Sequence, residues 1–105
     1  MRKLLGSFEL VVLLAVIRLG EDAYGVPVAR EVVRASRRNW SVASVYAALD
    51  RLEKKGLVAS QLGESTPERG GRAKKYFRVT ANGLRVARET KRTFAAFWQI
   101  VPETH

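Results

Sequence analysis

The chain has 105 residues, of which 47% are hydrophobic, so it is expected to fold as one small domain with a modest core. It contains no cysteine, and its single histidine is the last residue, which excludes disulfides and thiolate metal sites and removes the commonest nucleophile and base pairs of enzymes. Lys and Arg number 19 against 10 Asp and Glu, and the net charge of +9 favours a polyanionic partner, most simply nucleic acid, with an anionic membrane surface as the competing interpretation.

The N-terminal apolar run predicts a first helix from Phe8 to about Leu19, capped by Ser7 and ended by Gly20. The run is apolar almost all round, which favours burial on more than one side. A domain this small can hardly bury such a helix alone. Part of it, including Leu10 and Leu14, is therefore expected to face a second subunit.

The same N-terminal run also resembles a signal peptide, because Met-Arg-Lys precedes it. Glu9 interrupts the run, however, and no small-x-small cleavage pattern follows directly. The segment from Leu10 to Ile17 is much too short to span a bilayer. A cytoplasmic protein is expected, and the absence of cysteine fits that compartment. We expect no enzymatic activity, no metal and no cofactor.

A turn at Glu21–Ala23 leads into a second helix that starts around Tyr24–Pro27, where a proline is tolerated in the first turn. Its expected inward stripe is Val28, Val32 and Ala35. Positive charge at or beyond the exposed face comes from Arg30, Arg34, Arg37 and Arg38. Trp40, in the short link that follows, is interpreted as a core or strand residue and not as a platform for base stacking.

A third helix is expected between Ser41, which can cap it, and Gly56, which can end it in a left-handed conformation. Its inward stripe is Val42, Val45, Leu49 and Leu52. The opposite face consists of Ala43, Ser44, Ala47, Asp50, Arg51 and Lys54. Small side chains allow close approach to a partner, and a DNA major groove accepts a helix that reads with its N-terminal residues. An ordinary solvated surface helix remains the alternative.

Two strands, Leu57–Leu62 and Lys75–Val79, are expected to flank a long loop. The end of the loop reads ERGGRAKKY and places Arg69, Arg72, Lys74 and Lys75 around Gly70 and Gly71. Four cations in seven residues are suited to a phosphate clamp, since glycines let the backbone come close. A solvated basic loop is the alternative, but the loop directly after the third helix favours nucleic acid.

Thr80 is expected to cap a last helix that runs from about Ala81 toward Val101. One side of it carries Leu84, Ala87, Phe94, Phe97, Trp98 and Val101. We interpret this stripe as a packing seam in which the last helix of one chain meets the first and last helices of another.

This order of elements predicts a mainly α fold with a small β-hairpin: a winged helix-turn-helix over residues 1–80, then a C-terminal dimerisation helix over residues 81–105. The sequence resembles the PadR family of bacterial transcription regulators nearly end to end. The segments that carry the resemblance are FELVVLLAVIRLGEDAYGV, SVASVYAALDRLEKKGLV and ERGGRAKKYFRVTANG. The single short helix after the wing resembles the compact class of the family.

The resemblance implies a homodimeric repressor that binds a palindromic operator in double-stranded DNA. Ser41, Ser44, Tyr46 and Ala47 would then lie in or beside the groove, and Arg69, Arg72 and Lys74 would hold the flanking backbone. Tyr46 is almost as well explained as a core residue. The full set of expected DNA-binding residues is Ser41, Ala43, Ser44, Tyr46, Ala47, Arg51, Arg69, Gly70, Gly71, Arg72 and Lys74.

Some members of the family bind flat aromatic effectors between tryptophans at the dimer seam, where Trp98 would sit. The residues expected at the dimer interface or in an effector pocket are Leu10, Leu14, Phe94, Phe97, Trp98 and Val101. A simple aromatic plug between subunits is the alternative use of Trp98. Two other functions remain open: a winged-helix adaptor that binds a protein instead of DNA, and a basic RNA-binding protein.

Overall fold

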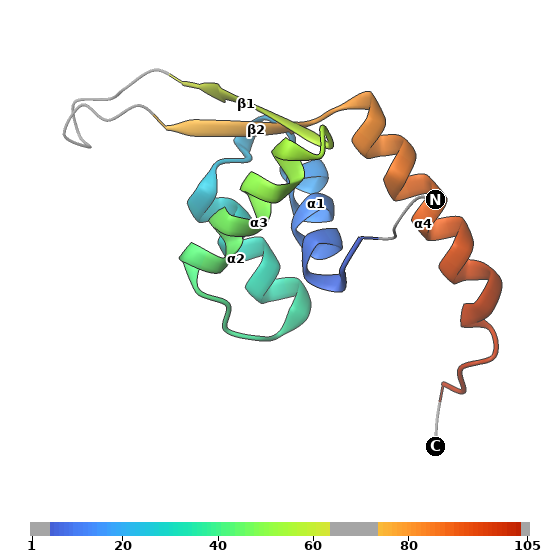
Figure 1. Cartoon of the computed structure of the whole chain (residues 1–105). Helices are drawn as coiled ribbons and strands as arrows, with labels where there is room; N and C mark the ends of the chain where they lie inside the picture. The colour runs from blue at the N-terminus through green and yellow to red at the C-terminus, as the bar shows by residue number, and fades with distance from the viewer. Residues whose placement is uncertain (1–4, 64–73, 104–105) are drawn as a thin grey trace.

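Three helices form the centre of the molecule, and a hairpin and a fourth helix extend from it (Figure 1). The computed structural model describes residues 5–63 and 74–103. The elements in chain order are α1 (Ser7–Leu19), the 3-10 turn η1 (Gly20–Asp22), α2 (Gly25–Ser36), α3 (Val42–Lys54), β1 (Val58–Leu62), β2 (Lys75–Val79) and α4 (Ala81–Trp98). This is the predicted mainly α fold with a small hairpin.

The apolar stripes of the three helices meet in one core. Its fully buried members with the largest side chains are Leu13, Leu49, Leu52, Val12, Val16, Val28, Val32, Val45 and Val58. Two residues of the predicted stripes do not join them, since Val42 is 46% exposed and Ala35 is exposed. Ala48 is fully buried instead. On a helical wheel Ala48 lies on the same side of α3 as Arg51 and Lys55, which contact α1, so the buried arc is rotated toward that helix.

Local capping fixes where the helices begin and end. The Ser41 Oγ accepts the backbone N–H of Ser44 at 3.0 Å, and the Thr80 Oγ1 accepts that of Gly83 at 3.0 Å, as predicted. Gly56, just past α3, has a φ of 76°. The predicted Ser7 cap is wrong: the N-cap of α1 is Gly6, and Ser7 is the first helical residue.

The hairpin is antiparallel, with a register that runs from Val58 opposite Val79 to Leu62 opposite Lys75. Its second strand is also tied to the segment before α2. The Phe77 N–H donates to the Ala23 carbonyl at 2.7 Å, and Tyr24 forms an isolated bridge with Tyr76. These bonds hold the base of the hairpin against the helical core.

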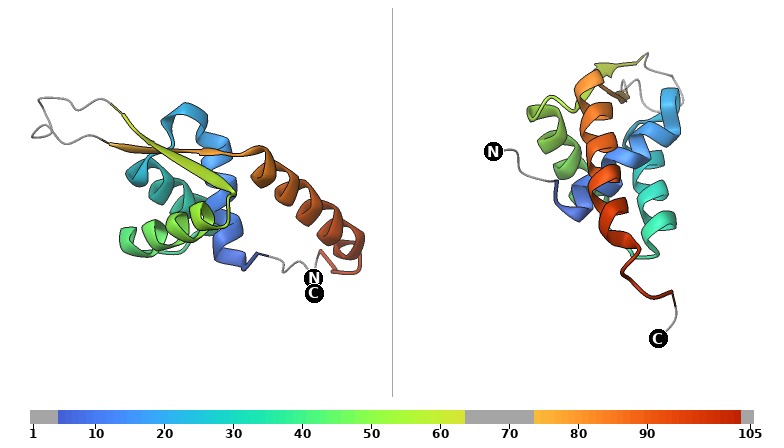
Figure 2. Two further views of the ribbon diagram at one scale, coloured as in Figure 1. Left: turned by 45° about the horizontal axis from the view of Figure 1, so that its top comes forward. Right: turned by 90° about the vertical axis from the view of Figure 1, so that its right-hand side faces the viewer.

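The fourth helix leaves the core and runs along its side (Figure 2). Gly83 and Thr90 are its only buried residues, and every described residue from position 91 onward is exposed. The helix ends at Trp98, earlier than predicted, and Ile100 and Val101 continue it as a tight turn that bonds back to Phe97 and Trp98. Pro102 disfavours helical backbone at the residue before it, which is consistent with this early end.

Candidate nucleic-acid interface

The exposed face of α3 is small and uncharged in its first half. Ala43 and Ala47 are exposed one turn apart along it. In the second half, the Lys54 Nζ lies 3.1 Å from the Asp50 Oδ2, so the two charges offset each other. A partner can therefore come close to the backbone of α3 at the N-terminal end of this face. The Lys54–Asp50 pair at its other end adds no net charge.

Two hydroxyls stand at the N-terminus of α3. The Ser41 and Ser44 Oγ atoms lie 2.8 Å apart, in addition to the capping bond from the Ser44 N–H. Ser41 is exposed and Ser44 is half-buried. Both groups can donate and accept, and they lie at the end of the helix that enters a DNA groove in helix-turn-helix proteins.

Tyr46 lies on the flank of α3 and covers the start of α2. A Cβ added at Gly25 would be 1.8 Å from the Tyr46 hydroxyl oxygen, so the ring rests directly on the glycine backbone. The residue as a whole is still 44% exposed. It therefore contributes both to packing between helices and to the surface beside the exposed face of α3.

Lys74 brings a positive charge to this flank from the hairpin. Its Nζ lies 4.4 Å from the centroid of the Tyr24 ring, and that ring lies 5.2 Å from the Tyr76 ring. Tyr24 directly precedes Gly25, on which Tyr46 rests. The cation and the flank of α3 are thus joined through a continuous set of contacts. The other predicted wing residues, Arg69, Gly70, Gly71 and Arg72, lie outside the described residues.

Glu53 connects the end of α3 to both strands of the hairpin. Its carboxylate accepts a short hydrogen bond from the Ser60 hydroxyl on β1 and lies 3.6 Å from the Lys75 Nζ on β2. The Ser60 hydrogen bond, with the nearby Lys75 charge, holds the pKa of Glu53 below its ordinary value. These contacts fix the hairpin relative to α3.

Arg51, one of the residues predicted to bind DNA, is paired with α1. Its Nε lies 2.7 Å from the Glu9 Oε2, and the Lys55 Nζ lies 2.6 Å from the Glu9 Oε1. Burial raises the pKa of Glu9. The hydrogen bonds from Lys55 and Arg51 lower it by more than burial raises it, so the pKa lies below its ordinary value. The only sequence signal for this site was an acid within an apolar helix.

Three further cations lie on α2 and in the turn that follows it. Arg30, Arg37 and Arg38 are exposed, and none of them forms an ion pair with another described residue. Arg37 adopts a left-handed conformation with a φ of 56°, and the Arg38 guanidinium lies 5.5 Å from the centre of the Trp40 ring. Trp40 is half-buried, 4.3 Å from the Phe8 ring, which agrees with its interpretation as a packing residue.

An apolar groove of about 380 Å³ lies between α1 and α4. It is lined by Leu10, Leu14, Leu84, Ala87, Arg88, Thr90, Lys91 and Phe94. Three residues of the predicted seam, Leu10, Leu14 and Phe94, are therefore brought together. Phe97, Trp98 and Val101 lie beyond the groove and are 65%, 66% and 52% exposed.

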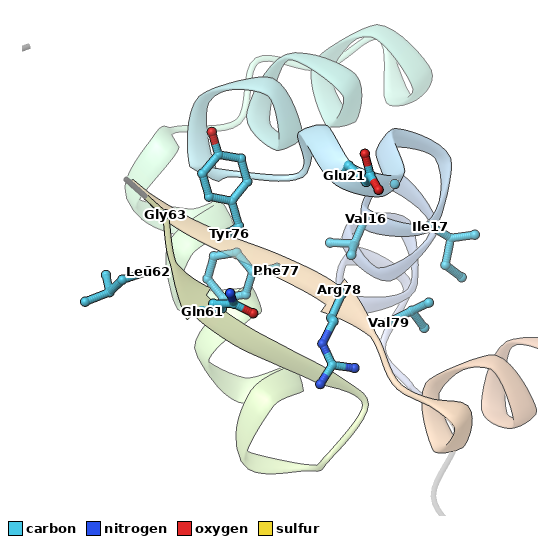
Figure 3. Close-up of a pocket in the computed structure, with 11 residues that line it drawn as sticks. Val16, Ile17, Glu21, Gln61, Leu62, Gly63, Tyr76, Phe77, Arg78 and Val79 are labelled. Atoms are coloured by element: carbon cyan, nitrogen blue, oxygen red, sulfur yellow. The ribbon is translucent and has the colours of Figure 1, made fainter. Parts of the chain in front are cut away.

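A second hollow, of about 500 Å³, was not predicted from the sequence. It lies between the end of α1, the η1 turn and the hairpin, with Val16, Ile17, Phe77 and Val79 among its apolar walls and Arg78 beside them (Figure 3). Within residues 5–63 and 74–103, no cluster of acidic or histidine side chains could hold a metal ion. No helix in those ranges is long and apolar enough to cross a membrane.

Comparisons with known proteins agree with this architecture. Residues 13–89 match the family described as the Transcriptional regulator PadR-like family. A crystal structure of a PadR-like transcriptional regulator from Bacillus cereus has a TM-score of 0.71 and 24% identity, covering 87% of this chain and 84% of that one. A PadR family transcription regulator from Clostridium difficile has a TM-score of 0.72 and 22% identity, covering 90% and 94%.

A third structure, a PadR family transcriptional regulator from Eggerthella lenta, is 29% identical, with a TM-score of 0.68 over 85% of this chain and 75% of that one. An uncharacterised protein from Lysinibacillus sphaericus is 28% identical over 85 residues, which is 79% of this chain and 75% of the relative. The match of the family to residues 13–89, which is most of the chain, leads to one conclusion: this chain belongs to the PadR-like family of transcriptional regulators.

Proposed function

We propose that this protein is a homodimeric repressor that inserts α3 of each copy into the major groove of a two-fold symmetric DNA operator. The observation that carries the proposal is the exposed N-terminal half of α3, which is small and uncharged and has the Lys74 cation beside its flank. A helix of this kind can approach base edges closely, and a neighbouring cation can neutralise the flanking phosphate.

The residues divide by the chemistry that they offer. The hydroxyls of Ser41 and Ser44 can hydrogen-bond to base edges, and the methyl groups of Ala43 and Ala47 suit thymine methyl groups. Lys74 and the arginines of the turn before α3 offer sequence-independent phosphate contacts. The wing-tip residues Arg69 and Arg72 are proposed to add to these contacts.

The homodimer is proposed from the groove between α1 and α4. Leu14 and Phe94 in that groove are 48% and 42% exposed, and the large apolar residues of the C-terminal turn are more exposed still. Contiguous apolar surface of this kind marks an interaction site, and the face of a second copy can cover it. Residues 81–105 are proposed to act as the dimerisation segment.

We further propose that a small flat effector binds at this seam and releases the operator. Phe97 and Trp98 are both exposed beyond the groove. In the proposed dimer, the Trp98 rings of the two copies can stack on an aromatic ring from opposite sides. The intrinsic fluorescence of a Trp40→Phe variant reports on Trp98 alone. Quenching of that signal by planar aromatic compounds, together with a weaker operator affinity, is the expected result. Quenching without any change in operator affinity contradicts release.

Selection of bound duplexes from a random pool at physiological salt tests the main proposal. The expected product is a two-fold symmetric consensus with half-sites about one helical turn apart, or a multiple of that. Affinity for it is expected to fall by about 10³ to 10⁵ between 50 and 200 mM salt if six to ten phosphates are contacted. No enrichment of any duplex contradicts the proposal, and salt-resistant capture of a protein partner favours the adaptor.

Two variants separate contacts with the DNA phosphates from recognition of the bases. Lys74→Ala is expected to weaken all duplexes alike and to reduce the slope of log affinity against log salt by about one unit. Arg92→Ala, which removes an exposed cation of α4 outside the groove between α1 and α4, is the matched control and is expected to leave the slope unchanged. Ser44→Ala is expected to change the preferred sequence. A consensus identical to that of the unmodified protein removes Ser44 from the proposed readout.

Sedimentation at micromolar concentration tests the dimer. Leu14→Glu places a charge in the groove and is expected to give a monomer, because burying that charge is unfavourable. Leu62→Glu, at a leucine of β1 that is 69% exposed, is the control and is expected to sediment like the unmodified protein. If the Leu14→Glu variant still sediments as a dimer, the dimer interface does not lie in this groove.

A further inference from the structure

Glu9 is one of only two polar or charged residues among the buried residues of the described chain, at 8% exposure. Each of its two carboxylate oxygens contacts a cation from the end of α3, Arg51 at 2.7 Å and Lys55 at 2.6 Å. Both cationic side chains are about half exposed, at 49% each. One carboxylate on α1 therefore holds two positive charges of the helix that is proposed to read DNA.

These cations lie on the same side of α3 as Ser44, about two to three turns toward the C-terminal end of the helix. Arg51 follows Ser44 by seven residues, close to two turns, so both project from the same flank of α3. The third cation of this region, Lys54, is paired with Asp50. Every cation between positions 42 and 55 thus has an acidic partner within the described structure, although the chain as a whole carries a net charge of +9.

We propose that Glu9 is a specificity-determining positioning residue, which keeps Arg51 and Lys55 against α1 and away from DNA phosphates. The proposal rests on the proposed DNA-binding function and adds a residue that no local pattern assigns to it. A phosphate contact from either cation would strengthen binding to every duplex equally. Withholding both contacts therefore lowers non-specific affinity and leaves discrimination to the N-terminal half of α3.

The size of the effect follows from counterion release. Each additional phosphate contact changes the slope of log affinity against log salt by about −0.9, which corresponds to roughly eight-fold in affinity for each ten-fold change in salt. Freed Arg51 and Lys55 side chains are long enough to leave α1 and turn toward solvent. Release of one or both is expected to steepen the slope by about one to two units.

The test is the Glu9→Gln variant, assayed against a duplex without the selected consensus and against the operator between 50 and 200 mM salt. The expected result is a steeper slope and a higher affinity for the non-operator duplex at the low-salt end. The ratio of operator to non-operator affinity is expected to fall. A purely structural role for Glu9 would instead weaken binding to both duplexes without steepening the slope.

The matched control is Glu31→Gln. Glu31 also holds two arginines, Arg34 and, at 3.6 Å, Arg18, but it does so between α1 and α2 and forms no ion pair with a residue of α3. The substitution changes the net charge by the same amount. We expect it to leave the slope unchanged. Equal steepening in both variants shows an effect of net charge alone and overturns the proposal.

Arg51→Gln keeps the inference testable even if Glu9→Gln does not fold, as judged by circular dichroism. With Glu9 intact, the proposal expects an unchanged salt slope, because Arg51 does not contact phosphate in the unmodified protein. A slope that falls by about one unit shows that it does and overturns the proposal. In the Glu9→Gln background, Arg51→Gln is expected to remove about half of the added slope.

Failure of the inference is distinguishable from failure of the proposed function. If the unmodified protein binds no duplex at all, both the proposed function and the role of Glu9 are contradicted. If it binds a symmetric operator and Glu9→Gln leaves the slope and the affinity ratio unchanged in a folded protein, only the role of Glu9 is overturned.

Discussion

Gly83 is the position at which α4 meets the base of the hairpin, and replacing it with alanine should displace the whole helix. A Cβ there would lie 2.1 Å from the Leu57 carbonyl oxygen and 2.8 Å from the Val79 Cγ2 atom. The Leu57 carbonyl cannot move away freely, because it accepts the Thr80 N–H at 3.0 Å. The Thr80 hydroxyl in turn donates to the Gly56 carbonyl at 2.7 Å. The start of α4 must therefore shift by nearly 1 Å to reach even the closest normal contact of 3.0 Å.

The expected loss of stability combines two opposing terms. Overpacking against a backbone carbonyl destabilises by up to about 3 kcal/mol. Replacing glycine with alanine in a helix recovers up to about 1 kcal/mol. The net loss is then about 2 kcal/mol, or a decrease of about 10 °C in Tm for a chain of this length. Because α4 is proposed to carry the dimer seam, operator affinity is expected to fall more than non-operator affinity.

Urea unfolding followed by circular dichroism, at one fixed chain concentration, measures this loss. Asn82→Ala is the control at the neighbouring exposed position, where only a hydrogen bond from Arg85 is removed. It is expected to change stability by less than about 0.5 kcal/mol. A Gly83→Ala protein as stable as the unmodified one would refute the close contact between α4 and the Leu57 carbonyl.

Three further predictions concern the ends of α3. Ser41→Ala removes the capping acceptor and is expected to lower the free energy of unfolding by about 1 kcal/mol in the same urea assay; no change means that water replaces the cap. Glu53→Gln weakens the hold on Ser60 and Lys75, so hairpin amides are expected to exchange hydrogen faster, while amides of α1 do not. Glu9, whose pKa is lowered in the folded state, stabilises the fold above its ordinary value of 4.5, and this contribution is lost as the pH falls through the folded-state pKa. Glu9→Gln should therefore flatten the fall in stability below about pH 4.5, and an unchanged pH profile contradicts the ion pairs.

The elements that sequence reasoning placed well are those that depend on nearby residues. Ser41 and Thr80 cap their helices because a hydroxyl reaches an N–H three residues ahead, whatever the rest of the fold does. The second strand, Lys75–Val79, was predicted with its observed bounds from its content of β-forming residues. Apolar spacing of three and four residues identified Val45 and Leu49 as core residues.

The features that were missed depend on contacts distant in sequence. The ion pair between Arg51 and Glu9 was missed because Glu9 lies 42 residues earlier and nothing local indicates the contact. The contact of Lys74 with Tyr24 likewise joins segments that only the folded chain brings together. Val42 was assigned inward because the wheel gives periodicity but not which neighbour covers each residue.

The distribution of charge separates two roles within the proposed interface. Because the cations of α3 are paired with Glu9 and Asp50, attraction to phosphate has to come from outside that helix. Cations in the described chain that can supply it include Lys74 on the hairpin side and Arg37 and Arg38 in the turn before α3. Substitutions in α3 are then expected to change which sequence is bound, and substitutions at the flanking cations to change how strongly any duplex is bound. The net charge of +9 therefore predicts the class of partner, whereas selectivity depends on which of those charges the fold keeps paired.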